Sequence, residues 1–157
     1  MILYHSSYME ITQPDLKRSR AANDFGRGFY TTPIYDQAVK GCAKLKRCGK
    51  DGIVSRYEFD ENGFKELKVL KFESYSEEWL DFIQVCRSGK DSTDYDIVVG
   101  SVIHNNLFNT TELYFQKLID KSEAIHRFHD EKPNLKICFR SERALKEYLR
   151  FEGSEVV

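Results

Sequence analysis

The sequence has no apolar run that approaches the roughly 18 residues that a membrane-spanning helix needs. The amino-terminal residues also lack the charged-then-apolar pattern of an export signal, so we expect a cytoplasmic protein that uses no membrane. The formal net charge of −1 creates no global field that would draw the chain to duplex DNA or an acidic membrane. With neither an internal repeat nor a low-complexity linker, residues 1–157 indicate a single domain.

Cysteine pairs of the Cys-x-x-Cys type are also missing, which argues against a zinc site. Cys42 and Cys86 fall on the apolar faces of predicted helices, so we expect free, buried thiols in a reducing compartment rather than disulfides. His126 and His129 lie three residues apart on a predicted helix. No nearby cysteine or second carboxylate pair completes a site around them, and we therefore expect no bound metal.

Extended and helical patterns alternate along the chain. Strands are predicted at residues 1–4, 28–32, 53–60, 66–72, 95–99, 135–139 and 149–157, with 61–63 as a hairpin turn between the third and the fourth. Helices are predicted after the Thr32-Pro33 cap, after the Ser76 cap, within 113–128 with Thr111 and Ser122 as caps, and at 141–148. Because the helices do not follow the strands in a strict β-α-β alternation, we expect an α+β fold on a bent, largely antiparallel sheet.

Residues 24–32, Asp-Phe-Gly-Arg-Gly-Phe-Tyr-Thr-Thr, are the most informative segment, and we call them the aromatic motif. Gly26 and Gly28 flank Arg27, so the chain can adopt positive φ and approach a ligand closely. So short a stretch cannot bury all three of its aromatic rings, which suggests that one ring and a basic group face a flat, anionic ligand. The alternative, in which the rings only fill the core, stays open.

The chain resembles a bacterial family known as the domain of unknown function 3990, which is similar to the ADP-ribosyltransferases. Five segments carry the resemblance in order: Leu3-Tyr4-His5-Ser6-Ser7, the aromatic motif, Trp79-Leu80-Asp81-Phe82 with Arg87, Tyr95 to Gly100, and Ile137-Cys138-Phe139 before Ala144-Leu145. The resemblance implies an ADP-ribosyltransferase-like split, mainly antiparallel β-sandwich with flanking helices. It also implies that NAD binds in a bent conformation in a cleft.

Residue roles follow from this resemblance. It implies that His5 bonds the ribose or the nicotinamide side of NAD, and that Tyr30 stacks on the nicotinamide ring. Arg27 offers a charge-assisted fork for phosphate, and the glycine-rich turn offers backbone N–H groups. The residues expected to bind NAD are His5, Ser6, Ser7, Phe25, Gly26, Arg27, Gly28, Phe29 and Tyr30.

The third catalytic group departs from the family pattern. A glutamine stands just before the last core strand in that pattern, whereas this chain has Lys136. A lysine cannot accept a hydrogen bond from a ribose hydroxyl, and its charge repels an oxocarbenium ion. Either Asn134 or Glu131 does this work, or Glu142 at the start of the next helix does, or transfer is lost. We take His5, Tyr30 and Glu142 as the catalytic candidates.

The expected function is therefore NAD-dependent transfer of ADP-ribose to a protein or nucleic acid, by a bacterial toxin with a possible antitoxin partner. The alternative is a catalytically impaired NAD-binding module that acts through protein–protein contacts. A basic cluster at Lys44, Lys46, Arg47 and Lys50 leaves both classes of acceptor open. Asp96 lies inside an apolar run and needs a partner if buried, for which Arg87 is the candidate.

Overall fold

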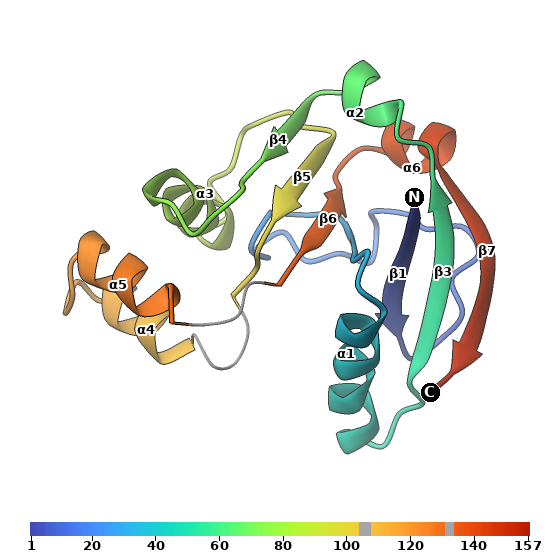
Figure 1. The fold of residues 1–157 in the computed structure, drawn as a ribbon, viewed down its shortest axis with the longest axis horizontal. Coiled ribbons are helices and arrows are strands. Elements are labelled where there is room, and N and C mark those ends of the chain that lie inside the picture. Colours follow the sequence, from blue (N-terminus) through green and yellow to red (C-terminus); the bar gives the residue numbers. More distant parts are fainter. Residues whose placement is uncertain (104–107, 131–133) are drawn as a thin grey trace.

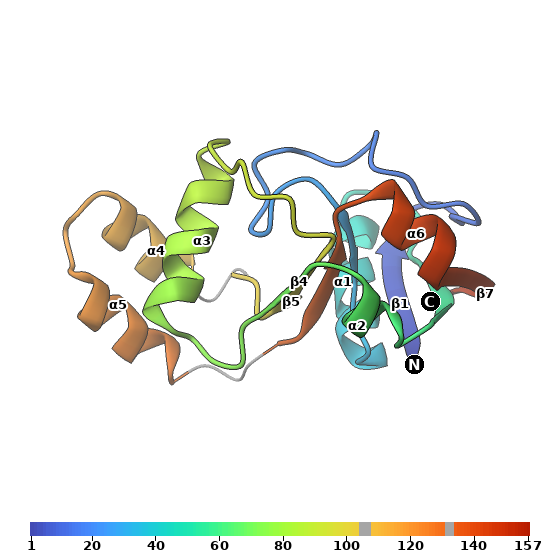
Figure 2. The ribbon, with the colours of Figure 1, turned by 90° about the horizontal axis from the view of Figure 1, so that it is seen from above.

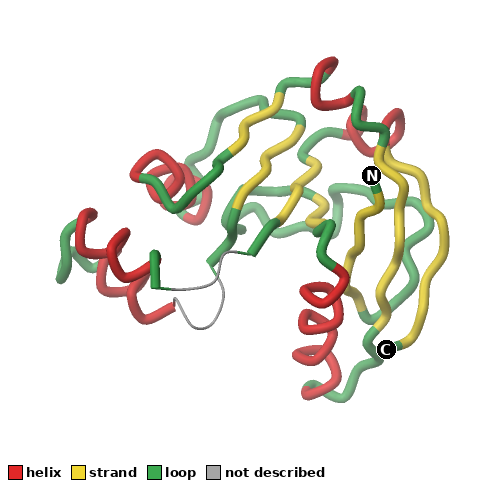
Figure 3. The backbone as a smooth tube through the Cα atoms, viewed as in Figure 1, coloured by secondary structure: helices red, strands yellow, loops and turns green. Residues whose placement is uncertain are grey.

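The computed structural model describes residues 1–103, 108–130 and 134–157, and its strands form two sheets (Figures 1 and 3). The first sheet has the order β1-β3-β7, with bounds Ile2–Ser7, Ile53–Phe59 and Leu149–Val156. The second has the order β2-β6-β5-β4, with bounds Phe29–Thr31, Lys136–Phe139, Ile97–Gly100 and Val69–Lys71. Within these sheets only β4 and β5 run parallel, which confirms the expected α+β class.

The two sheets meet at β1 and β2. Tyr4 and Thr32 exchange two backbone hydrogen bonds there, with N···O distances of 2.8 and 2.9 Å. Leu3, Phe29 and Tyr57 belong to the apolar core that fills the space between the sheets. Because Tyr4 pairs with Thr32, the residues that follow Tyr4 in β1 lie next to the aromatic motif.

The helices pack on parts of the two sheets, and most of β7 stays exposed (Figure 2). They are α1 (Tyr35–Arg47), α2 (Gly63–Glu66), α3 (Glu77–Arg87), α4 (Phe108–Phe115), α5 (Lys121–Phe128) and α6 (Glu142–Tyr148). Trp79 and Leu80 of α3 and Phe128 of α5 pack on the outer face of the second sheet, so that sheet is buried on both sides. Ala38 and Cys42 of α1 pack against Val54 of β3. None of the described helices is long and apolar enough to cross a membrane.

Helix starts follow the predicted caps in part. Ser76 accepts a hydrogen bond from the amide of Trp79, as expected for an N-cap. The predicted cap at Ser122 is wrong, because Asp120 caps α5 instead. Thr32 is also not the cap of α1: its hydroxyl accepts from the amide of Ile34, and the helix begins at Tyr35.

The predicted hairpin at residues 61–63 is wrong. Gly63–Glu66 forms the short helix α2, and β3 and β4 belong to different sheets. Leu67, directly after α2, is buried in the core between the sheets and so leads the chain from one sheet to the other. A Cβ at Gly63 would lie 3.0 Å from the Tyr148 ring and 3.2 Å from the Phe59 ring, so a larger residue would have to displace these rings slightly.

Asp24 links three parts of the chain, and the predicted Arg87–Asp96 pair is wrong. The Nε of Arg87 on α3 donates to Asp24 at 2.6 Å, and the amide of Ile103 donates to its other oxygen at 2.6 Å. Asp96 instead accepts from the amide of Lys68. The expectation of free thiols is confirmed, since all four cysteines are free and only Cys48 is exposed.

We expect Asp24→Ala to lower the free energy of unfolding by about 3 kcal/mol, because it leaves a partly buried guanidinium without its partner. The side chains of Asp24 and Arg87 are 9% and 24% exposed. The matched control is Asp81→Ala, which breaks the exposed ion pair with Lys121 and should cost less than about 1 kcal/mol. Urea unfolding compares the two variants; equal losses would show that Asp24 has no special structural role.

Candidate functional site

His5 lies in β1, opposite Ser55 of β3, and contacts the aromatic motif directly. Its Nδ1 is 2.6 Å from the carbonyl oxygen of Tyr30. A carbonyl only accepts hydrogen bonds, so Nδ1 carries the proton and Nε2 keeps its lone pair. The imidazole also stacks on the ring of Phe29, with the centroids 4.2 Å apart. The ring is therefore held in one tautomer and one orientation.

The environment of His5 keeps the imidazole neutral. Burial, opposed by the hydrogen bond to the Tyr30 carbonyl and aided by the nearby ammonium of Lys136, lowers the pKa of His5 from 6.5 to about 4. At neutral pH His5 therefore carries no charge, and its Nε2 can accept a hydrogen bond. Lys136 itself begins β6 and is half-buried, which lowers its own pKa.

The side chain of Tyr30 faces away from His5. Side chains alternate along a strand: Phe29 packs in the core between the sheets, whereas Tyr30 packs with the cluster beneath α3. Its hydroxyl donates to the carbonyl of Gly26 at 2.6 Å and accepts from the amide of Phe25 at 3.0 Å. Burial raises the pKa of Tyr30 well above its usual value. The structure thus brings His5 together with the Tyr30 carbonyl and the Phe29 ring, but not with the Tyr30 ring.

The glycine turn of the aromatic motif is held by internal hydrogen bonds. Gly26 has φ +76°, a conformation that favours glycine, and its amide donates to Asn23. The amide of Gly28 donates to the hydroxyl of Ser19 at 2.8 Å, and exposed Arg27 donates to the carbonyl of Ser19 at 2.9 Å. The amides of Gly26 and Gly28 are therefore already bonded, and the Arg27 guanidinium already donates to the Ser19 carbonyl. Phosphate binding at this turn would rest on the Arg27 side chain rather than on backbone N–H groups.

The serines after His5 have different environments. Ser6 donates to the carbonyl of Ala38 at 2.6 Å, which fastens β1 to α1. Ser7 accepts from the amide of Met9 and lines the same pocket as His5. Exposed Glu142 lies in the first turn of α6, where it accepts from the amide of Leu16 at 3.4 Å. The structure does not place Glu142 among the residues that line the His5 pocket.

The pocket at His5 has a volume of about 420 Å³. It lies between β1, the start of β2 and the irregular segment that joins them. Its lining residues are His5, Ser7, Tyr8, Met9, Glu10, Ile11, Thr12, Gln13, Asp15, Arg18, Ser19, Gly28 and Phe29. An aromatic wall, a neutral imidazole acceptor, two carboxylates and a guanidinium can together hold a polar ligand that carries a ring.

Gln37, near the junction of the sheets, was not found from the sequence. Gln37 of α1 accepts hydrogen bonds from the Thr32 hydroxyl at 3.1 Å and the Leu135 amide at 3.2 Å, so one side chain ties α1 to both β2 and the start of β6. Asn134, an alternative third group, is occupied by two hydrogen bonds to the Val102 backbone. Glu131, the other alternative, lies outside the described residues. The only sequence signal for Gln37 was its place in the first turn after Thr32-Pro33.

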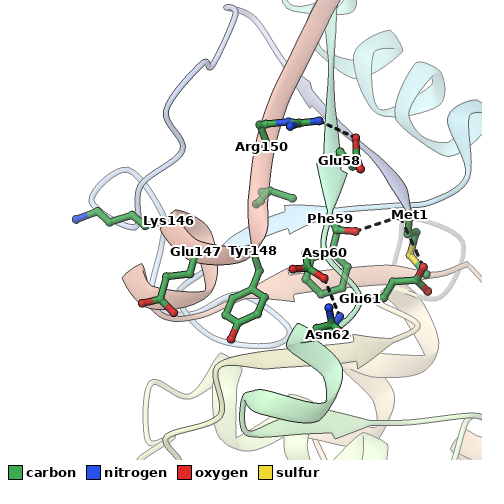
Figure 4. A pocket seen from close by; sticks show the side chains of 11 residues that line it. Met1, Glu58, Phe59, Asp60, Glu61, Asn62, Lys146, Glu147, Tyr148 and Arg150 are labelled. Atoms are coloured by element: carbon green, nitrogen blue, oxygen red, sulfur yellow. Dashed lines mark hydrogen bonds and ion pairs between the residues drawn. The ribbon is translucent and has the colours of Figure 1, made fainter.

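A second pocket, of about 670 Å³, lies where β3 and β7 approach α6 (Figure 4). Its charged groups largely neutralise one another: Arg150 pairs with Glu58 at 2.9 Å, and the amino group of Met1 lies 3.7 Å from Glu61. It holds no histidine or cysteine. Among the described residues, moreover, no three His, Cys, Asp or Glu side chains form a group that could hold a metal. The His5 pocket is therefore the better candidate site.

A family model described as "Protein of unknown function (DUF3990)" matches residues 1–151. The chain belongs to this family. A comparison with curated proteins finds no match. This match confirms the resemblance to the DUF3990 family over nearly the whole chain, and it assigns no activity.

We expect Tyr30→Phe to lower the free energy of unfolding by about 1–3 kcal/mol, because it leaves the Gly26 carbonyl and the Phe25 amide without their partner. Tyr8→Phe is the matched control, since the Tyr8 ring is 50% exposed. Chemical denaturation measures the free energy of unfolding of both variants. A Tyr30→Phe variant as stable as Tyr8→Phe would contradict the role of this hydroxyl in holding the turn.

We also expect stability to fall as the pH drops from about 6.5 towards about 4. The native pKa of His5 lies below 6.5, so in this window the unfolded chain binds more protons than the native chain. Urea unfolding at a series of pH values should give a flatter profile for His5→Gln than for wild type. His126→Gln, on the exposed surface of α5, should keep the wild-type profile. Parallel profiles for His5→Gln and wild type would rule out the buried neutral imidazole.

Proposed function

We propose that this chain is an NAD-dependent ADP-ribosyltransferase, a glycosyltransferase that moves ADP-ribose to a macromolecular acceptor. The supporting observation is the 2.6 Å contact between His5 Nδ1 and the Tyr30 carbonyl, which joins the two segments that carry the resemblance to such enzymes. That contact leaves Nε2 of a neutral imidazole as an acceptor in a pocket with an aromatic wall. A bacterial toxin in a toxin–antitoxin or defence system, acting in the cytoplasm, is the setting that the resemblance implies.

The proposed reaction breaks the bond between nicotinamide and the ribose. Neutral nicotinamide leaves, the ribose becomes oxocarbenium-like, and a nucleophile of the acceptor forms the new bond and loses a proton to solvent. His5 would accept a hydrogen bond from a ribose hydroxyl through Nε2 and so orient the sugar. Such positioning can supply several kcal/mol of the barrier. In this proposal Tyr30 acts through its carbonyl and through the turn that its hydroxyl holds, rather than through ring stacking.

The second candidate is an NAD-binding module that does not transfer ADP-ribose. It is favoured by Lys136, a half-buried cation that acts on His5 electrostatically and forms no ion pair with a described residue. A positive charge near the ribose raises the energy of a cationic transition state. Glu142, the carboxylate named from the sequence, lies outside the lining of the His5 pocket.

We expect purified protein to release nicotinamide from NAD in the presence of a cell extract that supplies acceptors. His5→Ala should lower this release at least about a hundredfold, because an oriented hydrogen-bonding group is lost. The control is His126→Ala, since His126 is exposed on α5. Equal release by wild type and His5→Ala would refute the proposal, and free ADP-ribose without a labelled acceptor would indicate NAD hydrolysis instead.

Lys136→Gln distinguishes the two candidates, because it restores the residue of the family pattern and removes the charge. If the chain is an impaired module, calorimetry should show NAD binding by the wild type without turnover, and Lys136→Gln should gain turnover. If the chain is an active enzyme, wild type already turns NAD over. Absence of NAD binding by both proteins would refute both candidates.

A further inference from the structure

The exposed face of α1 carries cations that have no ion partner. Lys40, Lys44 and Arg47 are all exposed, and none forms a salt bridge with a described residue. The cations of α5 and α6 differ, because they are neutralised by carboxylates. These pairs are Lys121–Asp81, Arg127–Glu123, Arg143–Glu147 and Lys146–Glu142. The charge on α1 is therefore available to a partner.

Helical geometry aligns these cations. Positions i, i+4 and i+7 share one side of a helix, so Lys40, Lys44 and Arg47 form a row about 10 Å long at about 1.5 Å per residue. Ala38 and Cys42 lie on the opposite side and are buried against the first sheet. The apolar face of α1 is thus already used within the fold, and its outward face carries these three cations and one carboxylate, that of Asp36.

A fourth cation, Lys50, follows α1 and contacts an exposed aromatic ring. Gly49, with φ +75°, reverses the chain after α1, and the amide of Lys50 returns to the carbonyl of Leu45 at 3.1 Å. The ammonium of Lys50 lies 4.6 Å from the centroid of the Tyr8 ring. Tyr8 is half exposed and lines the pocket that contains His5. Lys50, just after the C-terminal end of α1, thus connects the basic segment to the Tyr8 ring at the rim of the pocket.

We propose that α1 and Tyr8 bind single-stranded nucleic acid. A row of unpaired cations beside an exposed aromatic ring matches how such strands are held, by phosphate contacts and by stacking of an unpaired base. An acidic membrane is a poorer partner, because a helix on a membrane needs an outward apolar face. Duplex DNA offers no unpaired base to Tyr8. RNA and DNA strands share the required chemistry, so the experiment includes both.

The test is fluorescence anisotropy with labelled oligo-U and oligo-dT at several salt concentrations, without NAD, so that the result does not depend on the proposed transferase activity. The triple variant Lys40→Gln/Lys44→Gln/Arg47→Gln should bind at least about tenfold more weakly than wild type at low salt. Its log–log salt slope should be shallower by about 2, since each single-strand phosphate contact contributes about 0.7. Tyr8→Ala should also weaken binding, whereas Tyr8→Phe should not.

The matched control is Lys121→Gln/Arg127→Gln/Arg143→Gln, which changes the net charge equally but removes only cations that are already paired. This control should bind within about twofold of wild type. Equal weakening by both triple variants would show that net charge alone governs binding and would overturn the proposal. So would tighter binding to phosphatidylserine vesicles or to a duplex of the same length, or the absence of binding by wild type at low salt.

Discussion

Two backbone hydrogen bonds between Tyr4 and Thr32 join the sheets, and the geometry of the candidate site depends on them. They fix the register of β1 against β2, so that His5 meets the Tyr30 carbonyl and Ser6 meets the Ala38 carbonyl. Successive side chains of a strand point to opposite faces, so a slip of one residue would turn His5 away from Phe29 and the pocket. The imidazole and α1 are therefore both placed by the same short junction.

Some local features of the fold could be predicted from the sequence. Ser76 and Ser141 cap their helices as expected, because an N-cap depends on residues within one turn. The predicted hairpin at 61–63 is wrong because Glu-Asn-Gly is compatible with both a hairpin turn and a helical turn. The burial of Leu67 and the pairing of β4 with β5, both set by distant residues, decided the outcome. Burial and strand pairing that depend on distant residues leave no signal in a short stretch of sequence.

At the candidate site, too, some features could be predicted from the sequence and others could not. His5 was named from the resemblance of the first segment to the family, and it lies within β1, whereas the face of Tyr30 could not be inferred from a strand of three residues. The segment at 8–19 forms one wall of the pocket, yet it has no periodicity that would reveal its course. The partner of Arg87 was mistaken for a similar reason, because Asp24 lies in the irregular loop before β2.

The closeness of Gly28 to β6 constrains how this chain can diverge. A Cβ at position 28 would overlap the sulfur of Cys138 and lie 2.8 Å from the Phe139 carbonyl oxygen. A smaller residue at 138 would relieve the first overlap, but no substitution removes a backbone carbonyl. Position 28 should therefore stay invariant over evolutionary time even in descendants that have lost activity, and its conservation there would report on folding rather than on catalysis.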